Sequence, residues 1–152
     1  MRSLPGLLLL TSLLTFVLTA SYTNTVSGSQ TASAESGTIA FNLNATGDLP
    51  GMLSVKLNHE GGNVTGGSWT LTVLPANADA TSSESGRITG TFSGGTITLD
   101  SNGIATAAGS IQLSVQSGTG QFESVTSGNG SLSLSADAEN STKLGGPLTL
   151  NF

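Results

Sequence analysis

Few side chains in this sequence could do acid–base chemistry, and they lie far apart along the chain. His59 is the only histidine and is followed directly by Glu60. An imidazole beside a carboxylate can serve as a general base. Gly61 and Gly62 come next, however, so the pair is predicted to lie in a solvated hairpin turn. Serines abound, but none stands in the G-x-S-x-G context of a nucleophile elbow. The sequence therefore predicts no catalytic residues.

Two acidic segments invite comparison with calcium sites. Residues 100–103 (Asp-Ser-Asn-Gly) begin like a calcium loop, but Ile111 stands where such a loop needs its bidentate glutamate. Asn-Gly is a strong hairpin signal, so a turn is expected there. Asp137 and Glu139, with Asn140, could hold a weakly bound calcium ion or form a solvated acidic loop. The chain has no cysteine, which excludes disulfides and thiolate zinc sites. No metal and no cofactor is expected.

The charge distribution argues against nucleic-acid binding. The formal net charge is −5, the calculated pI is about 4.4, and only 9% of the residues are charged. Lys56, Arg87 and Lys143 are widely separated, so no run of cations could displace counterions from phosphates. We expect no nucleic-acid partner.

The first 20 residues have the order of a secretory signal peptide. Arg2 precedes an apolar run from Leu7 to Leu18, and small residues follow up to a cleavage site after Ala20. This run is shorter than the roughly 20 residues that cross a bilayer, although a retained anchor is the competing interpretation. Residues 21–36 lack apolar periodicity and are predicted to be a flexible linker. Residues 37–152 then form the domain of a secreted or periplasmic protein.

Within the domain, apolar and polar residues alternate with a period of two, which is typical of strands with one dry and one wet face. The runs are 39–43, 53–57, 69–73, 88–92, 97–99, 111–115, 132–134 and 148–152. Turn signals separate them, including Gly94-Gly95 and Asn102-Gly103. The fold class expected is all-β, a closed antiparallel barrel of about eight short strands, with an open sandwich as the alternative.

The stretch from Ile111 to Leu134 shows this pattern most clearly. Two segments of alternating apolar and polar residues, each predicted to be a strand, flank a glycine-rich connection. Phe122 and Val125 are the bulky apolar residues of that connection and are predicted to close one end of the core like a lid. The stretch resembles the GTG-x-F-x-x-ATG-x-G-x-L pattern in the barrels of dirigent proteins and allene oxide cyclase. The matching residues are Gly118, Thr119, Gly120, Phe122, Thr126, Gly128 and Gly130. The resemblance implies an eight-stranded barrel with an apolar pocket that assembles into homo-oligomers. The acidic pocket residues of dirigent proteins have no counterpart in this chain.

Three functions follow from these observations. The first is an exported, non-catalytic barrel that binds a small apolar ligand, with Trp69, Phe122 and Phe41 as ligand-contacting residues, or that acts as a surface or structural module. The second, implied by the resemblance, is a cyclase or isomerase that acts by confinement in the barrel pocket. The third is a small outer-membrane barrel, suggested by the alternating Leu148-x-Leu150-x-Phe152 at the end of the chain. Short alternating runs and few aromatic residues argue against membrane association.

Overall fold

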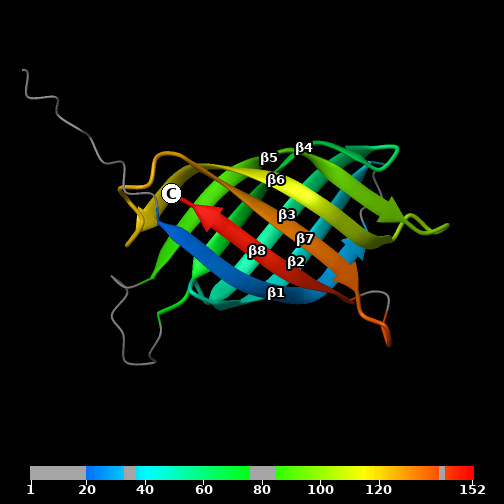
Figure 1. Cartoon of the computed structure of the whole chain (residues 1–152), viewed down its shortest axis with the longest axis horizontal. Coiled ribbons are helices and arrows are strands. Elements are labelled where there is room, and N and C mark those ends of the chain that lie inside the picture. The colour runs from blue at the N-terminus through cyan, green and yellow to red at the C-terminus, as the bar shows by residue number, and fades with distance from the viewer. Residues whose placement is uncertain (1–19, 33–36, 76–84, 141–142) are drawn as a thin grey trace, which may run out of the picture.

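The structure, a computed structural model, describes residues 20–32, 37–75, 85–140 and 143–152 and consists of one closed sheet (Figure 1). Eight antiparallel strands follow one another around the barrel in chain order, and β1 pairs with both β2 and β8 to close it. The strands are β1 (Ser21–Ala32), β2 (Thr38–Gly47), β3 (Gly51–Glu60), β4 (Asn63–Val73), β5 (Gly86–Leu99), β6 (Ala105–Gly120), β7 (Gly128–Ala136) and β8 (Lys143–Asn151). The predicted closed antiparallel barrel is confirmed.

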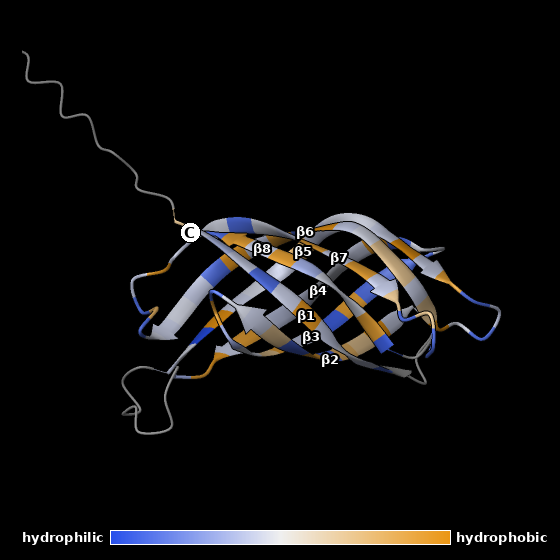
Figure 2. Cartoon of the chain, turned by 60° about the horizontal axis from the view of Figure 1, so that its bottom comes forward, coloured by the Kyte–Doolittle hydropathy of each residue, from blue (hydrophilic) through white to orange (hydrophobic). Residues whose placement is uncertain are grey.

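Alternation along the strands decides what lies inside. In β3, for example, Leu53, Val55 and Leu57 are buried, whereas Ser54 and Lys56 between them are exposed. The same pattern recurs around the barrel, and Figure 2 shows it as orange bands alternating with pale or blue ones along the strands. The inward side chains form one apolar cluster inside the barrel. Burial of this cluster is the main favourable term in folding.

The predicted linker is wrong over most of its length, because Ser21–Ala32 forms β1. The inward positions of this strand include Asn24, Gly28 and Gln30, which alternate with the fully buried Val26. Apolar periodicity is therefore absent, although the backbone is paired along both edges. The predicted signal peptide lies outside the described residues except for Ala20.

The number of strands agrees with the expected eight because two errors in the prediction offset each other: β1 was not expected, and β5 was expected as two strands. The runs 88–92 and 97–99 belong to one strand, β5, so the turn expected at Gly94-Gly95 is also wrong. These glycines instead accompany register shifts between β5 and β6, and Gly95 has a φ of +128°. Glycine allows a bulge that bends a strand as readily as a turn that ends it. The strands are not short either, since β5 has 14 residues and β6 has 16.

The Asn102-Gly103 hairpin is confirmed. Gly103 has a φ of +77°, and the carboxylate Oδ1 of Asp100 accepts hydrogen bonds from the amides of Asn102 (2.8 Å) and Ile104 (2.9 Å). The acidic residue of this segment thus stabilises the turn between β5 and β6. Among the described residues, no helix is long and apolar enough to span a membrane.

Candidate functional site

The barrel has two ends of different construction. At the terminal end, the described chain starts and finishes side by side, and Ala20 and Phe152 exchange backbone hydrogen bonds of 3.1 Å in both directions (left in Figure 1). β2, β4 and β6 end at this end of the barrel, and β3, β5 and β7 begin there. Three partly buried apolar residues that pack against the core, Tyr22, Val125 and Phe152, lie at the terminal end.

The β6–β7 connection brings Phe122 to the terminal end. Tight backbone bonds fold it, from Phe122 N to Thr119 O (3.2 Å) and from Val125 N to Phe122 O (2.9 Å). Only 7% of Phe122 is exposed, and Val125 packs against the same core. A Cβ at Gly86 would lie 2.6 Å from the Phe122 ring, so that glycine leaves the space which the ring fills. The predicted lid is confirmed.

Two further aromatic residues join Phe122. Tyr22 stacks on Phe152 with ring centroids 4.7 Å apart, and Phe122 meets Phe152 edge-on at 6.0 Å. Beside them lies a hollow of about 490 Å³, which we call the aromatic hollow. It is lined by Tyr22, Gln121, Phe122, Ser124, Val125, Thr126, Ser127 and Phe152. Among the described residues that line it there is no Asp, Glu, Lys, Arg or His, so it combines apolar rings with hydroxyl and amide groups.

The structure separates the three aromatic residues predicted to contact a ligand. Trp69 and Phe41 are each 1% exposed and belong to the packed core, whereas Phe122 borders the aromatic hollow. A second, outer hollow across β2, β3 and β4 also includes Phe41 and Trp69, but their side chains are buried on the other side of the sheet. Trp69 faces Gly90 on β5, where a Cβ would lie 2.7 Å from the indole, and its Nε1 donates to the carbonyl of Thr91 (3.2 Å). The indole is therefore held by the core itself.

Two amide side chains on β1, neither of them predicted from the sequence, bind backbone groups at the two ends of the barrel. Nδ2 of Asn24 donates to the carbonyl of Leu49 (2.7 Å), and its Oδ1 accepts from the amide of Leu49 (2.9 Å). This pair of bonds holds a buried leucine of the β2–β3 connection at the terminal end. Gln30 makes the same two bonds with the backbone of Ala105 at the opposite end, at 2.8 and 2.9 Å. Their alternation with Val26 could have identified them, had β1 been recognised as a strand.

His59 does not lie in the expected turn. It is part of β3, is half-buried at the opposite end, and its backbone amide donates to the carbonyl of Gly37 (2.7 Å). Its Nδ1 is shielded from solvent and finds no hydrogen-bond partner within the ranges that the structure describes. The acidic loop after β7 is tied to its own backbone, because Oδ1 of Asp137 accepts from the amide of Glu139 (2.8 Å). Within the described ranges, no three His, Asp or Glu side chains are grouped to hold a metal ion.

Comparison with known proteins adds no relative from which a role could be transferred. The chain matches no protein-family model, no curated protein and no solved structure. What the site can do must therefore be argued from its own residues. The aromatic hollow offers apolar contact from rings and Val125, and hydrogen bonds from its hydroxyl and amide groups. Such a surface suits an uncharged ligand with an apolar ring or chain.

Proposed function

We propose that this chain is an exported, non-catalytic β-barrel module that binds a small, uncharged and mainly apolar ligand at the aromatic hollow. The observation that carries the proposal is the cluster of Tyr22, Phe122 and Phe152 beside a hollow whose lining includes no charged residue. Ligand sites combine apolar walls with a few polar groups that fix orientation. The resemblance of the β6–β7 segment to dirigent proteins and allene oxide cyclase also favours a ligand-binding barrel.

Export is supported by the order of the first 20 residues, and their removal would leave all eight strands in place. The direction of the apolar face separates this proposal from an outer-membrane barrel. Leu113 and Leu150 are buried inside, whereas the outward residues of β1, such as Thr23 and Thr25, are exposed. A transmembrane barrel needs the opposite arrangement, with an apolar band facing lipid. The length of the strands does not separate the two, since all have nine residues or more.

Catalysis by confinement has less support. That alternative needs a polar group at the barrel mouth that is free to act on a substrate. Asn24 and Gln30 lie near the two mouths, but each uses its amide oxygen and nitrogen to bind backbone. His59 has a free Nδ1, yet its neighbour Glu60 is exposed and shows no hydrogen bond to it among the described residues. We therefore propose binding rather than turnover.

The test is an NMR titration of the mature chain, residues 21–152, with three uncharged probes: a phenol, a monoterpenoid alcohol and a medium-chain fatty alcohol. We expect the amide signals of residues 121–127 and Phe152 to shift with at least one probe, while those of the Asn102-Gly103 turn stay in place. Phe152→Ser should weaken the binding, because it removes the ring that both Tyr22 and Phe122 contact. Met52→Ser, at an exposed position on the outside of β3, is the matched control.

Two outcomes would contradict the proposal. If none of the probes shifts any signal, the ligand-binding part fails and a structural module remains. If the shifts instead centre on Trp69 and Phe41, the ligand enters the core and the aromatic hollow is not its site. Circular dichroism of Phe152→Ser and Met52→Ser shows whether each variant keeps the barrel.

A further inference from the structure

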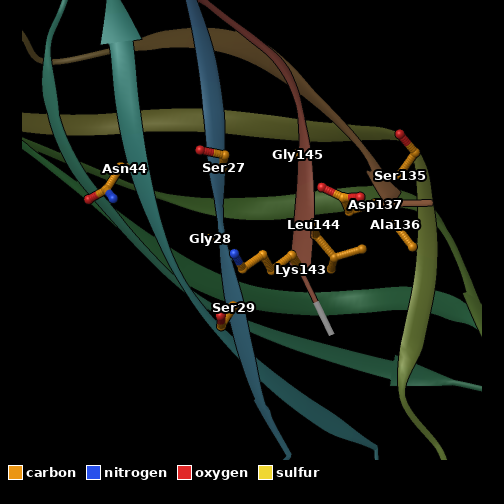
Figure 3. A pocket seen from close by; sticks show the side chains of 10 residues that line it. All are labelled: Ser27, Gly28, Ser29, Asn44, Ser135, Ala136, Asp137, Lys143, Leu144 and Gly145. Atoms are coloured by element: carbon orange, nitrogen blue, oxygen red, sulfur yellow. The ribbon is translucent and has the colours of Figure 1, made fainter. Parts of the chain in front are cut away.

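Another hollow, with a polar lining, lies on the outer face of the barrel across β2, β1, β8 and β7 (Figure 3). We call it the polar groove. Its volume is about 650 Å³, inside the roughly 300–1,000 Å³ range of small-molecule sites. The side chains that supply its polar groups are Ser27, Ser29, Asn44, Ser135, Asp137 and Lys143. None of these residues takes part in the aromatic hollow.

The groove exists because one outward position has no side chain. The strand register places Asn44, Ser27, Gly145 and Ser135 in a row across four neighbouring strands. A Cβ at Gly145 would lie 3.1 Å from the carbonyl oxygen of Val26 and 3.6 Å from the Cβ of Ser27. The third of the three nearest atoms is the Cα of Ser27, at 3.8 Å. The row thus has a gap at Gly145, and this gap is the floor of the groove.

Lys143 forms one side of the groove. It pairs with Ser29 in the β1–β8 ladder, and Figure 3 shows its amine end beside Gly28 while Asp137 lies on the β7 side. Within the described part of the chain, the Lys143 amine makes no ion pair and no hydrogen bond. An ammonium donor and a carboxylate acceptor therefore face the same hollow.

Among the described residues, the polar side chains of the groove make no hydrogen bond with one another. Some outward side chains on other neighbouring strands do bond in pairs, as Ser54 does with Asn42 (3.2 Å) and Thr89 with Ser117 (2.8 Å). Ser27, Asn44 and Ser135 show no such bond among the described residues. A ligand could bind to them by displacing water, without first breaking a hydrogen bond within the protein.

We infer that the polar groove binds a neutral, hydroxyl-rich saccharide segment. Serine hydroxyls and the Asn44 amide can each donate and accept, which matches the alternating donors and acceptors of sugar hydroxyl groups. Lys143 adds donors and Asp137 adds acceptors, and their charges cancel within the groove. The acidic net charge of the chain disfavours polyanions at the same surface.

The experiment is an NMR titration of the mature chain with maltotetraose, cellotetraose and chitotetraose as neutral probes and tetragalacturonate as an anionic probe. We expect at least one neutral probe to shift the amide signals of Ser27, Ser135 and Gly145. Lys143→Met should weaken this binding at least about tenfold, equivalent to about 1.4 kcal/mol. Lys56→Met is its control, since Lys56 is also exposed and outward but lies on β3, outside the groove.

Filling the gap gives a second test. Gly145→Val should abolish the shifts by occupying the floor of the groove. Gly94→Val is the matched control, because a Cβ at Gly94 would have no neighbour within 4 Å. Either of two results would overturn the inference: no neutral probe shifts the groove signals, or the shifts survive both Lys143→Met and Gly145→Val. Binding of tetragalacturonate alone would overturn it as well.

The two proposed sites can fail separately. Phe152→Ser changes the aromatic hollow only and should leave saccharide binding at the polar groove unchanged. Lys143→Met should equally leave the response to the apolar probes unchanged.

Discussion

At the scale of single residues, the barrel depends on a few side chains that satisfy backbone groups at its ends. Asn24 and Gln30 are six positions apart on β1. Asn24 makes two hydrogen bonds with the backbone of Leu49 in the β2–β3 connection, and Gln30 makes two with the backbone of Ala105 at the start of β6. A connection that folds over a barrel end must find partners for its buried amides and carbonyls. These two amides provide them, so residues that look like linker in the sequence close both ends of the core.

Replacing Asn24 with Ala should destabilise the protein by about 2–4 kcal/mol, because the buried amide and carbonyl of Leu49 would both lose their partner. Equilibrium unfolding in urea measures this change. Asn44→Ala is the control, since Asn44 is exposed on the outside of β2, and it should leave the free energy of unfolding nearly unchanged. If the two substitutions changed the free energy of unfolding by the same amount, the loss at Asn24 could not be assigned to its hydrogen bonds with Leu49, and the prediction would be wrong.

Phe122→Ala should cost about 3–5 kcal/mol, as expected for a large buried aromatic residue. The ring fills the space above Gly86 and touches Phe152, so its loss would leave a cavity at the terminal end. Thermal and urea unfolding would both report it. A loss below about 1 kcal/mol would mean that the β6–β7 connection is a loose surface loop rather than a lid.

At the scale of strands, β1 and β5 show what sequence patterns can and cannot predict. Strands such as β3 were predicted because burial of every second residue imposes an apolar period of two. The sequence pattern does not predict β1, because its inward face carries two amide side chains and a glycine. Backbone pairing with a neighbouring strand produces no apolar periodicity of its own. The pattern predicts two strands in place of β5, because Gly94-Gly95 is typical of a turn. In the structure these glycines lie within one long strand, where its register with β6 shifts.

The same reasoning explains why the candidate sites were predicted only in part. Phe122 was found because it is an isolated bulky residue between glycines. Tyr22 could not be connected with it, since that contact depends on β1 closing against β8. The polar groove also requires that closure, because its residues come from both ends of the chain.

Gly28→Val tests how tightly β1 is bound into the barrel. Gly28 pairs with Leu43 of β2, and a Cβ there would collide with the backbone oxygen of Asn42. We expect β1 to be pushed away from β2, with a loss of more than about 2 kcal/mol in the free energy of unfolding. Hydrogen exchange should show faster exchange of the β1 and β2 amides. Gly94→Val is the control, and equal stability of the two variants would contradict close packing of β1.

At the scale of the whole molecule, an alternating pattern defines two faces but does not say which of them is inside. Aqueous and transmembrane barrels share the period of two and differ in the direction of the apolar face. The structure places Trp69, Leu113 and Leu150 inside, and the large apolar residues exposed within the described ranges are Met52 and Leu74. These two residues lie near each other at the terminal end of β3 and β4, and they do not form a band around the barrel that would face lipid.

The mature chain, residues 21–152, is therefore expected in the periplasmic or culture fraction without detergent. Its outer face consists mainly of Ser, Thr and Asn, which water solvates well, and its apolar side chains are already packed together. Adding detergent micelles should leave the fluorescence emission of Trp69 unchanged, because the indole is buried among protein atoms in either case. The opposite result would be a chain that stays in the membrane fraction, or that keeps its native emission only in detergent. Either outcome would show that the apolar face of the strands points outward to lipid.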